Sequence, residues 1–375
     1  MSAPAETRFE HPFGSLSLRR WPRRPGETLR AWDGADRYLL EVMAEEGLAG
    51  PTLVLNDQCG ALSLALRQRG TAVLGSGDSW LAHRALTANA DDNGIVLAGA
   101  DWAWADQPLP AGAEQALIRL PKETSLLAWQ LAGLGRALPA GAPVWLAGMD
   151  KHLPDQLADI LAPYLVQPQA GLGRHKARVF RGRVPAQPAP LPAPVTLPLP
   201  EYGWTLRNGA GVFARQQLDI GARFLLDHVP SGIEGDICDL GCGNGVIGMM
   251  ALRRNPQARL WSCDESALAL ASARDNIARA FPGRETHFHL GNGLDGLEQQ
   301  FDLILLNPPF HRGHAVDDSV ARMLFRHARR HLRAGGRLRV IGNSHLNYAA
   351  RLRRHFNSVH QVARNTKFTL HDATL

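Results

Sequence analysis

The sequence predicts an α/β protein of two tandem Rossmann-like domains, each with a largely parallel sheet between helices. The run Leu303–Leu306 is fully apolar, which is typical of a strand buried on both faces of such a sheet. A second short strand-like run, Asp236–Leu240, leads through glycines into the helix-like segment Val246–Leu252. The stretch from residue 51 to residue 179 repeats this order of strands, turns and helices, so the chain contains the architecture twice.

A proline-rich segment separates the two copies. Residues 184–200 carry prolines at 185, 188, 190, 192, 194, 198 and 200, which predicts a semi-rigid polyproline linker. We therefore expect domains at 1–183 and 201–375, and a chain of 375 residues is long enough for both.

The remaining elements follow from local patterns. Apolar residues at strand or helix spacing predict strands at 13–18, 52–55 and 202–206, and helices at 29–43, 61–66, 216–226 and 325–332. Asp219 and Arg223, one turn apart on the 216–226 helix, are expected to pair on its surface.

Composition and charge narrow the function classes. A net charge of +6 and a sequence pI near 9.5 favour a polyanionic partner, although a basic pI alone is weak support. The four cysteines form no C-x-x-C pair and are expected as reduced, packed thiols. No apolar run has the length of a membrane helix and the amino terminus lacks a signal peptide, so we expect no membrane association and a cytoplasmic protein.

Glycines at alternate positions follow the strand at 236–240. Gly241, Gly243 and Gly245 allow the backbone to approach a ligand closely, in a spacing that matches neither the dinucleotide fingerprint nor a P-loop. About 20 residues further on, the strand-like run 259–263 ends at Asp264, whose carboxylate can accept hydrogen bonds from both ribose hydroxyls. The pattern predicts a nucleoside cofactor.

Two more strand ends complete the predicted site. The run 287–290 ends in Gly291-Asn292-Gly293, a turn suited to an adenine edge. The strand 303–306 ends in Asn307-Pro308-Pro309-Phe310, where the Asn307 side chain and the Pro308 carbonyl can accept the two hydrogens of a planar amine while Phe310 stacks on its ring. The alternative is a stiff strand-ending turn with Phe310 in the core.

The glycine loop followed by Asn-Pro-Pro-Phe resembles the class I S-adenosylmethionine-dependent methyltransferases that modify planar nitrogens, namely adenine N6, cytosine N4, glutamine amide and guanine N2. The surroundings are similar to the bacterial ribosomal RNA guanine-N2 methyltransferases, and the amino-terminal half is similar to their large-subunit branch. The segments that carry this resemblance are 29–40, 50–63, 211–224, 239–248, 307–315 and 325–330. The resemblance implies two tandem class I methyltransferase domains, the first of them degenerate.

The resemblance also implies the site. It assigns catalysis to Asn307, Pro308 and Phe310 and needs no metal. It assigns S-adenosylmethionine binding to Phe213, Arg215, Asp239, Gly241, Gly243, Gly245, Asp264, Asn292, Gly293 and Asn307. His311 and His314 belong to a loop expected over the target base, and no further ligand accompanies them that would suit a metal ion.

The resemblance implies methyl transfer to the exocyclic N2 of a specific guanine in large-subunit (23S) ribosomal RNA, by a monomer. The alternatives are a 16S ribosomal RNA guanine-N2 methyltransferase, a glutamine-amide methyltransferase of a translation factor, and a non-catalytic RNA-binding module.

The amino-terminal copy has lost the residues that this chemistry needs. Asn56 and Gln58 stand opposite Gly241 and Gly243, while Gly60 stands opposite Gly245. The further correspondences expected are Gly77 with Cys263, Asn89 with Asn276, and Leu120 with Asn307. We expect this half to help hold RNA, and an active site with unusual motifs remains the alternative.

Basic clusters supply candidate RNA contacts. The first surrounds Trp21, the second is an alternating strand at 174–183, and the third lies on the 325–332 helix. Their members are Arg19, Arg20, Arg23 and Arg24; Arg174, His175, Lys176, Arg178, Arg181 and Arg183; and Arg326, Arg329, Arg330 and Arg333. Each could equally be a solvated face, and the strand could be an edge with protective charges.

Overall fold

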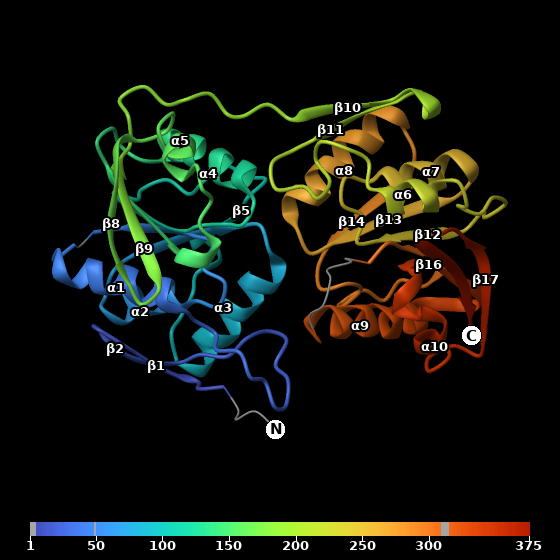
Figure 1. Ribbon diagram of the computed structural model, residues 1–375, viewed down its shortest axis with the longest axis horizontal. Coiled ribbons are helices and arrows are strands. Elements are labelled where there is room, and N and C mark those ends of the chain that lie inside the picture. Colours follow the sequence, from blue (N-terminus) through green and yellow to red (C-terminus); the bar gives the residue numbers. More distant parts are fainter. Residues whose placement is uncertain (1–4, 49, 309–314) are drawn as a thin grey trace. The chain divides into compact units, whose positions relative to one another are not determined.

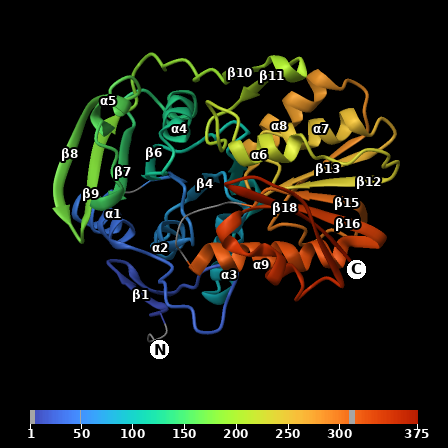
Figure 2. The same ribbon diagram turned by 45° about the vertical axis from the view of Figure 1, so that its right-hand side comes forward.

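The computed structural model describes residues 5–48, 50–308 and 315–375, and the chain divides into two compact units, Met1–Ala193 and Pro194–Leu375. Each unit holds one seven-stranded sheet with helices on both faces, as Figures 1 and 2 show. The α/β class predicted from the sequence is confirmed.

The sheet of the second unit has the strand order β14-β13-β12-β15-β16-β18-β17. Its first five strands are parallel, and β18 runs antiparallel between β16 and β17. The strands are β12 (Asp236–Leu240), β13 (Arg259–Asp264), β14 (Thr286–Leu290), β15 (Phe301–Leu306), β16 (Leu332–Asn343), β17 (Ser358–Arg364) and β18 (Phe368–Thr374).

Helices cover both faces of this sheet. The helices are α6 (Ile220–Leu226), α7 (Val246–Arg254), α8 (Ala267–Ala280), α9 (Ala315–His331) and α10 (Tyr348–Leu352). One apolar cluster packs α6, α7 and α8 against the sheet, and a second packs α9 and α10 against the other face (Figure 1). The central strands are therefore buried on both sides, as the apolar run Leu303–Leu306 of β15 predicts.

The first unit repeats this topology, with the order β5-β4-β3-β6-β7-β9-β8. Its strands are β3 (Thr52–Leu55), β4 (Val73–Gly77), β5 (Trp102–Trp104), β6 (Gln115–Arg119), β7 (Pro143–Met149), β8 (Val166–Arg174) and β9 (Ala177–Arg183). Its helices are α1 (Gly34–Glu45), α2 (Ala61–Gln68), α3 (Trp80–Asp92), α4 (Thr124–Ala137) and α5 (Leu157–Leu161). The internal repeat read from the sequence is therefore a repeat of structure.

Two hairpins and four short 3₁₀ turns lie outside the large sheets. The hairpins are β1 (Arg8–His11) with β2 (Gly14–Ser17), and β10 (Val195–Leu199) with β11 (Trp204–Asn208). The 3₁₀ turns are Gly99–Asp101, Asp150–His152, Pro200–Tyr202 and Ser344–Leu346. Residues 195–199 were expected inside the polyproline linker and instead form β10, because a two-stranded hairpin tolerates the missing N–H of Pro198.

Two elements differ from those predicted from the sequence, one because of a side-chain cap and the other because of a turn. The helix expected from residue 216 begins at Ile220, since Asp219 caps it by accepting a hydrogen bond from the Ala222 N–H. The basic strand expected at 174–183 is a hairpin of β8 and β9. Its turn residues His175 and Lys176 both have φ near 57°.

All four cysteines are free and buried, as expected. Among the residues described, no helix combines the length and the apolar character needed to cross a membrane.

Candidate active site

The predicted site residues lie where the second sheet reverses its order. The strand β12 pairs with β13 on one side and with β15 on the other, and Leu240 lies opposite Leu306. Gly241 and Asn307 therefore follow the carboxyl ends of neighbouring strands. Ligands of doubly wound sheets bind at this switch point.

The glycine loop has the left-handed backbone that its sequence predicts. Gly241, Gly243 and Gly245 have φ values of 75°, 54° and 82°. A Cβ atom added to Gly241 or Gly243 would meet nothing within 4 Å, whereas one on Gly245 would lie 3.0 Å from the Cα of Ala273. The first two glycines thus border open space, and the third lets α7 pack closely against α8.

Asp264 clamps this loop to the end of β13. Its Oδ2 accepts a hydrogen bond from the Gly243 N–H at 2.9 Å, and its Oδ1 accepts one from the Ser266 N–H at 3.0 Å. Burial raises the pKa of this carboxyl above its usual value. A carboxylate has about four acceptor positions, and the Glu265 N–H uses a third one, so Asp264 keeps spare acceptor capacity for a ligand hydroxyl.

Asp239, at the end of β12, is fully buried and has an unused acceptor. Its Oδ2 accepts a hydrogen bond from the Gly248 N–H at 2.8 Å, while its Oδ1 has no partner among the described residues. Burial raises the pKa of Asp239 to about 7. A buried acceptor without a partner is costly unless a ligand satisfies it.

Asn307 is oriented by Asp219, a residue for which the sequence predicted a different partner. Its Nδ2 donates to the Oδ2 of Asp219 at 3.2 Å, so its Oδ1 is left as an acceptor, buried and without a described partner. The expected Asp219–Arg223 pair is wrong, because Asp219 caps α6 and Arg223 bridges to Glu201. The cap signal before α6 was visible in the sequence, but its contact with Asn307 spans 88 residues.

Pro308 is buried directly after Asn307. Phe310, His311 and His314 lie outside the described residues.

Asn292 and Gly293 form the turn after β14. Asn292 donates to Asp295 at 3.0 Å, and Gly293 has φ near 65° with the His327 ring beside it. The Nδ1 of His327 accepts a hydrogen bond from the Leu294 N–H at 3.1 Å. Burial lowers the pKa of His327, which favours the neutral ring that this bond requires. The sequence reading missed His327 because its partner is 33 residues away.

Phe213 and Arg215 lie on the loop between β11 and α6. The Phe213 side chain is 67% exposed, so no core contact fixes it. Arg215 and Asn208 exchange hydrogen bonds, from Arg215 Nε to the Asn208 carbonyl and from Asn208 Nδ2 to the Arg215 carbonyl. Asn208 also accepts a hydrogen bond from Asn244 at 3.2 Å, which ties this loop to the glycine loop.

A buried asparagine on α8 supports the same loop. Asn276 donates to the Asn244 carbonyl at 3.0 Å and accepts from the Arg207 N–H at 2.7 Å. A polar residue on the buried face of a predicted helix is the signal that could have identified it. No group of three or more His, Cys, Asp or Glu side chains in the described parts of the chain could hold a metal ion.

Strand register corrects two of the expected correspondences in the first unit. Leu55 lies opposite Ile118 as Leu240 lies opposite Leu306, so Arg119, rather than Leu120, matches Asn307. Leu55 also pairs with Ser76 as Leu240 pairs with Cys263. Gly77 therefore matches Asp264.

Arg119 is held by acidic residues at the end of β6. It donates to Asp33 at 2.9 Å and lies 3.2 Å from Asp36, in the position where Asn307 meets Asp219 in the second unit. Burial raises the pKa of Asp36 to about 7, against the opposing effect of Arg119. No amide acceptor remains at this strand end.

The fold and this loop geometry define a methyltransferase of the class I type. The profile of the Methyltransferase small domain matches residues 203–372, and that of the RLMG N-terminal domain matches residues 6–186. The chain belongs to the ribosomal RNA large subunit methyltransferase G family. It is 52% identical to the protein of that name from Alcanivorax borkumensis over 97% of this chain and 96% of the relative. It is 41% identical to the Pseudomonas aeruginosa PAO1 protein over 96% and 98%.

A solved structure shares the fold of the whole chain. It is the 16S rRNA N2 G1207 methyltransferase RsmC of T. thermophilus, solved with AdoMet and guanosine. The TM-score is 0.76 at 22% identity, and the match covers 98% of this chain and 97% of that one.

Proposed function

We propose that the second unit transfers the methyl group of S-adenosylmethionine to the exocyclic N2 of a guanine in large-subunit (23S) ribosomal RNA. The observation that carries this proposal is the buried Oδ1 of Asn307, an oriented acceptor without a partner beside an open glycine loop. The relatives are named as large-subunit enzymes, and the structure with the same overall fold was solved with guanosine.

The residues of the site fit the cofactor. The open space at Gly241 and Gly243 admits its methionine end, and the orphaned Asp239 Oδ1 suits its ammonium group. Asp264 retains acceptor capacity for a ribose hydroxyl, and Asn292 and Gly293 follow the neighbouring strand at the adenine edge. The cofactor supplies an electrophilic methyl group. Phe213 and Arg215 complete its binding loop.

Catalysis rests on positioning. A guanine N2 amine is a weak nucleophile because its lone pair is delocalised into the ring. Asn307 Oδ1 and the Pro308 carbonyl hold the two amine hydrogens so that the lone pair faces the methyl group. Phe310 stacks on the base. The Asp219 contact keeps the Asn307 amide from rotating.

The match of residues 6–186 to the RLMG N-terminal domain favours this proposal over a glutamine-amide methyltransferase and over an enzyme for 16S RNA. Residues 1–183 form the RNA-holding half and 201–375 the catalytic half, joined through 184–200. One chain contains both halves and acts as a monomer in the cytoplasm.

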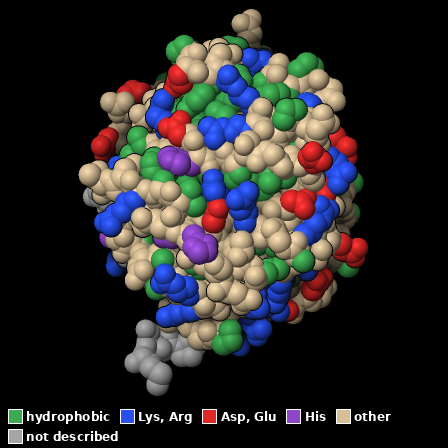
Figure 3. Space-filling view, turned by 90° about the vertical axis from the view of Figure 1, so that its right-hand side faces the viewer, with side chains coloured by type: hydrophobic (Ala, Val, Ile, Leu, Met, Phe, Trp, Pro, Cys, Tyr) green, Lys and Arg blue, Asp and Glu red, His purple; other side chains and the backbone are tan. Residues whose placement is uncertain are grey.

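The basic clusters do not contribute equally to RNA binding in this proposal. The β8–β9 arginines are paired within the unit, Arg174 with Glu41 and Glu45, and Arg181 with Glu46. Arg333 is similarly engaged by Asp236 and Asp302. Acidic and basic side chains both occur across the face shown in Figure 3. Arg23 of the Trp21 cluster is likewise paired, with Asp92. Arg19 and Arg20 of that cluster and the exposed α9 arginines at 326, 329 and 330 are therefore the stronger candidates.

The test is incubation with a tritiated methyl donor and three separate acceptors: unmodified 23S RNA, 16S RNA and a purified translation factor. Label in 23S RNA that digestion assigns to N2-methylguanosine supports the proposal. Label in 16S RNA or protein only, or no label with an enzyme that binds the cofactor, would overturn it.

A further inference from the structure

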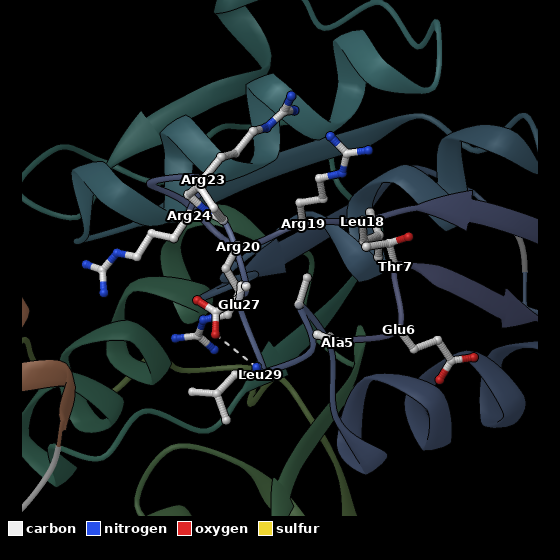
Figure 4. A pocket seen from close by; sticks show the side chains of 13 residues that line it. Ala5, Glu6, Thr7, Leu18, Arg19, Arg20, Arg23, Arg24, Glu27 and Leu29 are labelled. Carbon is white, nitrogen blue, oxygen red and sulfur yellow. Dashed lines mark hydrogen bonds between the residues drawn. The ribbon is translucent and has the colours of Figure 1, made fainter. Parts of the chain in front are cut away.

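The first unit contains two adjoining cavities, and the smaller of them lies at the carboxyl end of its sheet. One, of about 480 Å³, is lined by Arg19, Arg20, Arg23 and Arg24 of the loop after β2 (Figure 4). The other, of about 80 Å³, lies at the ends of β3 and β6, where Asp57, Gln58 and Arg119 line it. The two linings share Arg20 and Ala31, so the cavities are neighbours.

Three of the residues that line the smaller cavity carry a buried polar atom with no partner among the described residues. These atoms are the Nε1 of Trp32, the Oδ1 of Asp57 and the Nη1 of Arg119. Trp32 is 5% exposed and Asp57 only 2%. Two buried donors and one buried acceptor around one cavity each cost stability unless a ligand or water satisfies them.

The same arrangement occurs at the switch point of the second unit. There the orphaned atoms are Asp239 Oδ1 and Asn307 Oδ1, both acceptors, at the ends of β12 and β15. In the first unit Val54 stands opposite Asp239, but Asp57, two residues beyond the end of β3, accepts a hydrogen bond from the Ser63 N–H as Asp239 does from the Gly248 N–H. Arg119 takes the place of Asn307, so this position carries an acceptor and a donor. The loss of the glycine loop therefore changed the chemistry of this position and left a polar cavity.

The larger cavity supplies positive charge. Four arginines line it against two glutamates, Glu6 and Glu27, and one of the four, Arg23, is paired with Asp92 at 2.6 Å. Glu27 is partly engaged, because its Oε1 accepts hydrogen bonds from the Thr28 and Leu29 N–H groups. Figure 4 shows the Arg20 side chain extending towards Glu27 and Leu29. A guanidinium at a cavity wall suits a phosphate group, because it is positively charged and its planar donors can form two parallel hydrogen bonds to the phosphate oxygens.

We propose that these cavities together bind one ribonucleotide of the substrate RNA, with its phosphate at the arginines and its ribose hydroxyls in the small polar cavity. A 2′-hydroxyl both donates and accepts, so it can donate to Asp57 and accept from Trp32 or Arg119. Phosphate contacts position an RNA without reading its sequence. This inference rests on the proposed function, because the RNA that is held is the RNA to be methylated.

The test uses the full chain and fluorescence anisotropy with a labelled oligouridylate and its 2′-deoxy counterpart, over a range of salt concentrations. Arg20→Ala should weaken binding about threefold to tenfold and flatten the salt dependence by about 0.7 in log–log slope, the share of one phosphate on a single strand. Trp32→Phe should leave the slope unchanged and lower the preference for ribose over deoxyribose about threefold to tenfold, the value of one hydrogen bond.

Arg183→Ala serves as the matched control, because this exposed arginine on β9 lies outside both cavities. It should not change the ribose preference. Melting curves identify any variant that fails to fold, and the remaining variant still decides the outcome. Wild-type slopes in Arg20→Ala, or an unchanged ribose preference in Trp32→Phe, would overturn the inference.

Guanosine 5′-monophosphate distinguishes a nucleotide within RNA from a free one. Pocket-dependent binding of the monophosphate, with oligonucleotide binding unaffected by both substitutions, would overturn the RNA assignment. Tritiated methyl transfer by the wild-type enzyme is scored separately. A chain that methylates 23S RNA but ignores both substitutions refutes only this inference, and one that never methylates it refutes the proposed function.

Discussion

The two units share a scaffold and differ at the strand ends. Gly60 and Gly245 both precede a helix with φ near 83°, at 84° and 82°, and Asn89 and Asn276 both donate to the loop before that glycine. Asn56 keeps the left-handed backbone of Gly241, at φ 61°, but its side chain pairs with Gln130. The two units thus share a scaffold, and a few side chains at the switch point distinguish them.

The largest expected difference between the halves concerns cofactor binding. Gly243→Val should abolish S-adenosylmethionine binding, because the branched side chain enters the open space beside the loop and φ of 54° disfavours it. Gln58→Val at the matching position should leave the affinity unchanged. Isothermal calorimetry of both variants gives the answer, and equal loss in both would mean that the cofactor does not bind at the second unit alone.

The next difference concerns turnover. Asn307→Ala should lower kcat by a factor of roughly ten to a thousand with little change in cofactor affinity, because one positioned acceptor is lost. Arg119→Ala should leave kcat at saturating RNA unchanged. It should destabilise the first unit by about 3 kcal/mol, since Asp33 and Asp36 lose their cation. Methyl incorporation and thermal unfolding measure the two effects. Normal turnover in Asn307→Ala would contradict the assignment of the active site.

A smaller expected difference between the halves is the pH dependence of cofactor affinity. The pKa of Asp239 is raised to about 7, so the carboxyl is neutral below that pH and charged above it. Binding of the cofactor's ammonium favours the charged form, so affinity should fall about tenfold from pH 7.5 to pH 5.5. Asp239→Asn should remove the dependence. Asp36→Asn, at the acid of similar pKa in the first unit, should retain it. A flat profile for the wild-type enzyme would exclude Asp239 as the ammonium ligand.

The smallest expected effect tests the shared scaffold. Asn89→Ala and Asn276→Ala should each destabilise their own unit by about 2 kcal/mol, because buried backbone groups lose their partner. Only Asn276→Ala should also weaken cofactor binding, severalfold, since it loosens the glycine loop. Calorimetric unfolding and cofactor titration can be run on the same samples. A similar loss of cofactor affinity in Asn89→Ala would mean that the halves are coupled.

The sequence was sufficient for the order of the functional loops, because glycine spacing and apolar strands are local patterns. The glycine loop, Asp264 and the strand before Asn307 all lie where they were predicted. The pairing register of neighbouring strands, in contrast, could not be predicted from a local pattern. The segment from Leu117 to Leu120 is apolar except at Arg119, and apolar residues on both sides of Arg119 conceal the end of β6, so the match to Asn307 was placed one residue too late.

Contacts between segments that are distant in the sequence could not be predicted either. Asp219 was assigned to a surface pair one helical turn away, whereas its partner Asn307 comes from another strand end. The β8–β9 arginines gave the pattern of a phosphate stripe, but Glu45 at the end of α1 and Glu46 directly after it engage two of them. The acidic partner of a basic residue is determined by packing, so it cannot be predicted by counting charges in the sequence.

The matched asparagines form the same contacts in both units. Asn89 bonds both the N–H and the carbonyl of Arg19, and Asn276 bonds the same two groups of Arg207. Each asparagine thereby joins the segment before its own sheet to the helix that follows the second strand, in a unit that keeps the glycine loop and in one that does not. The same clasp therefore serves folding in both units, whatever the neighbouring loop binds.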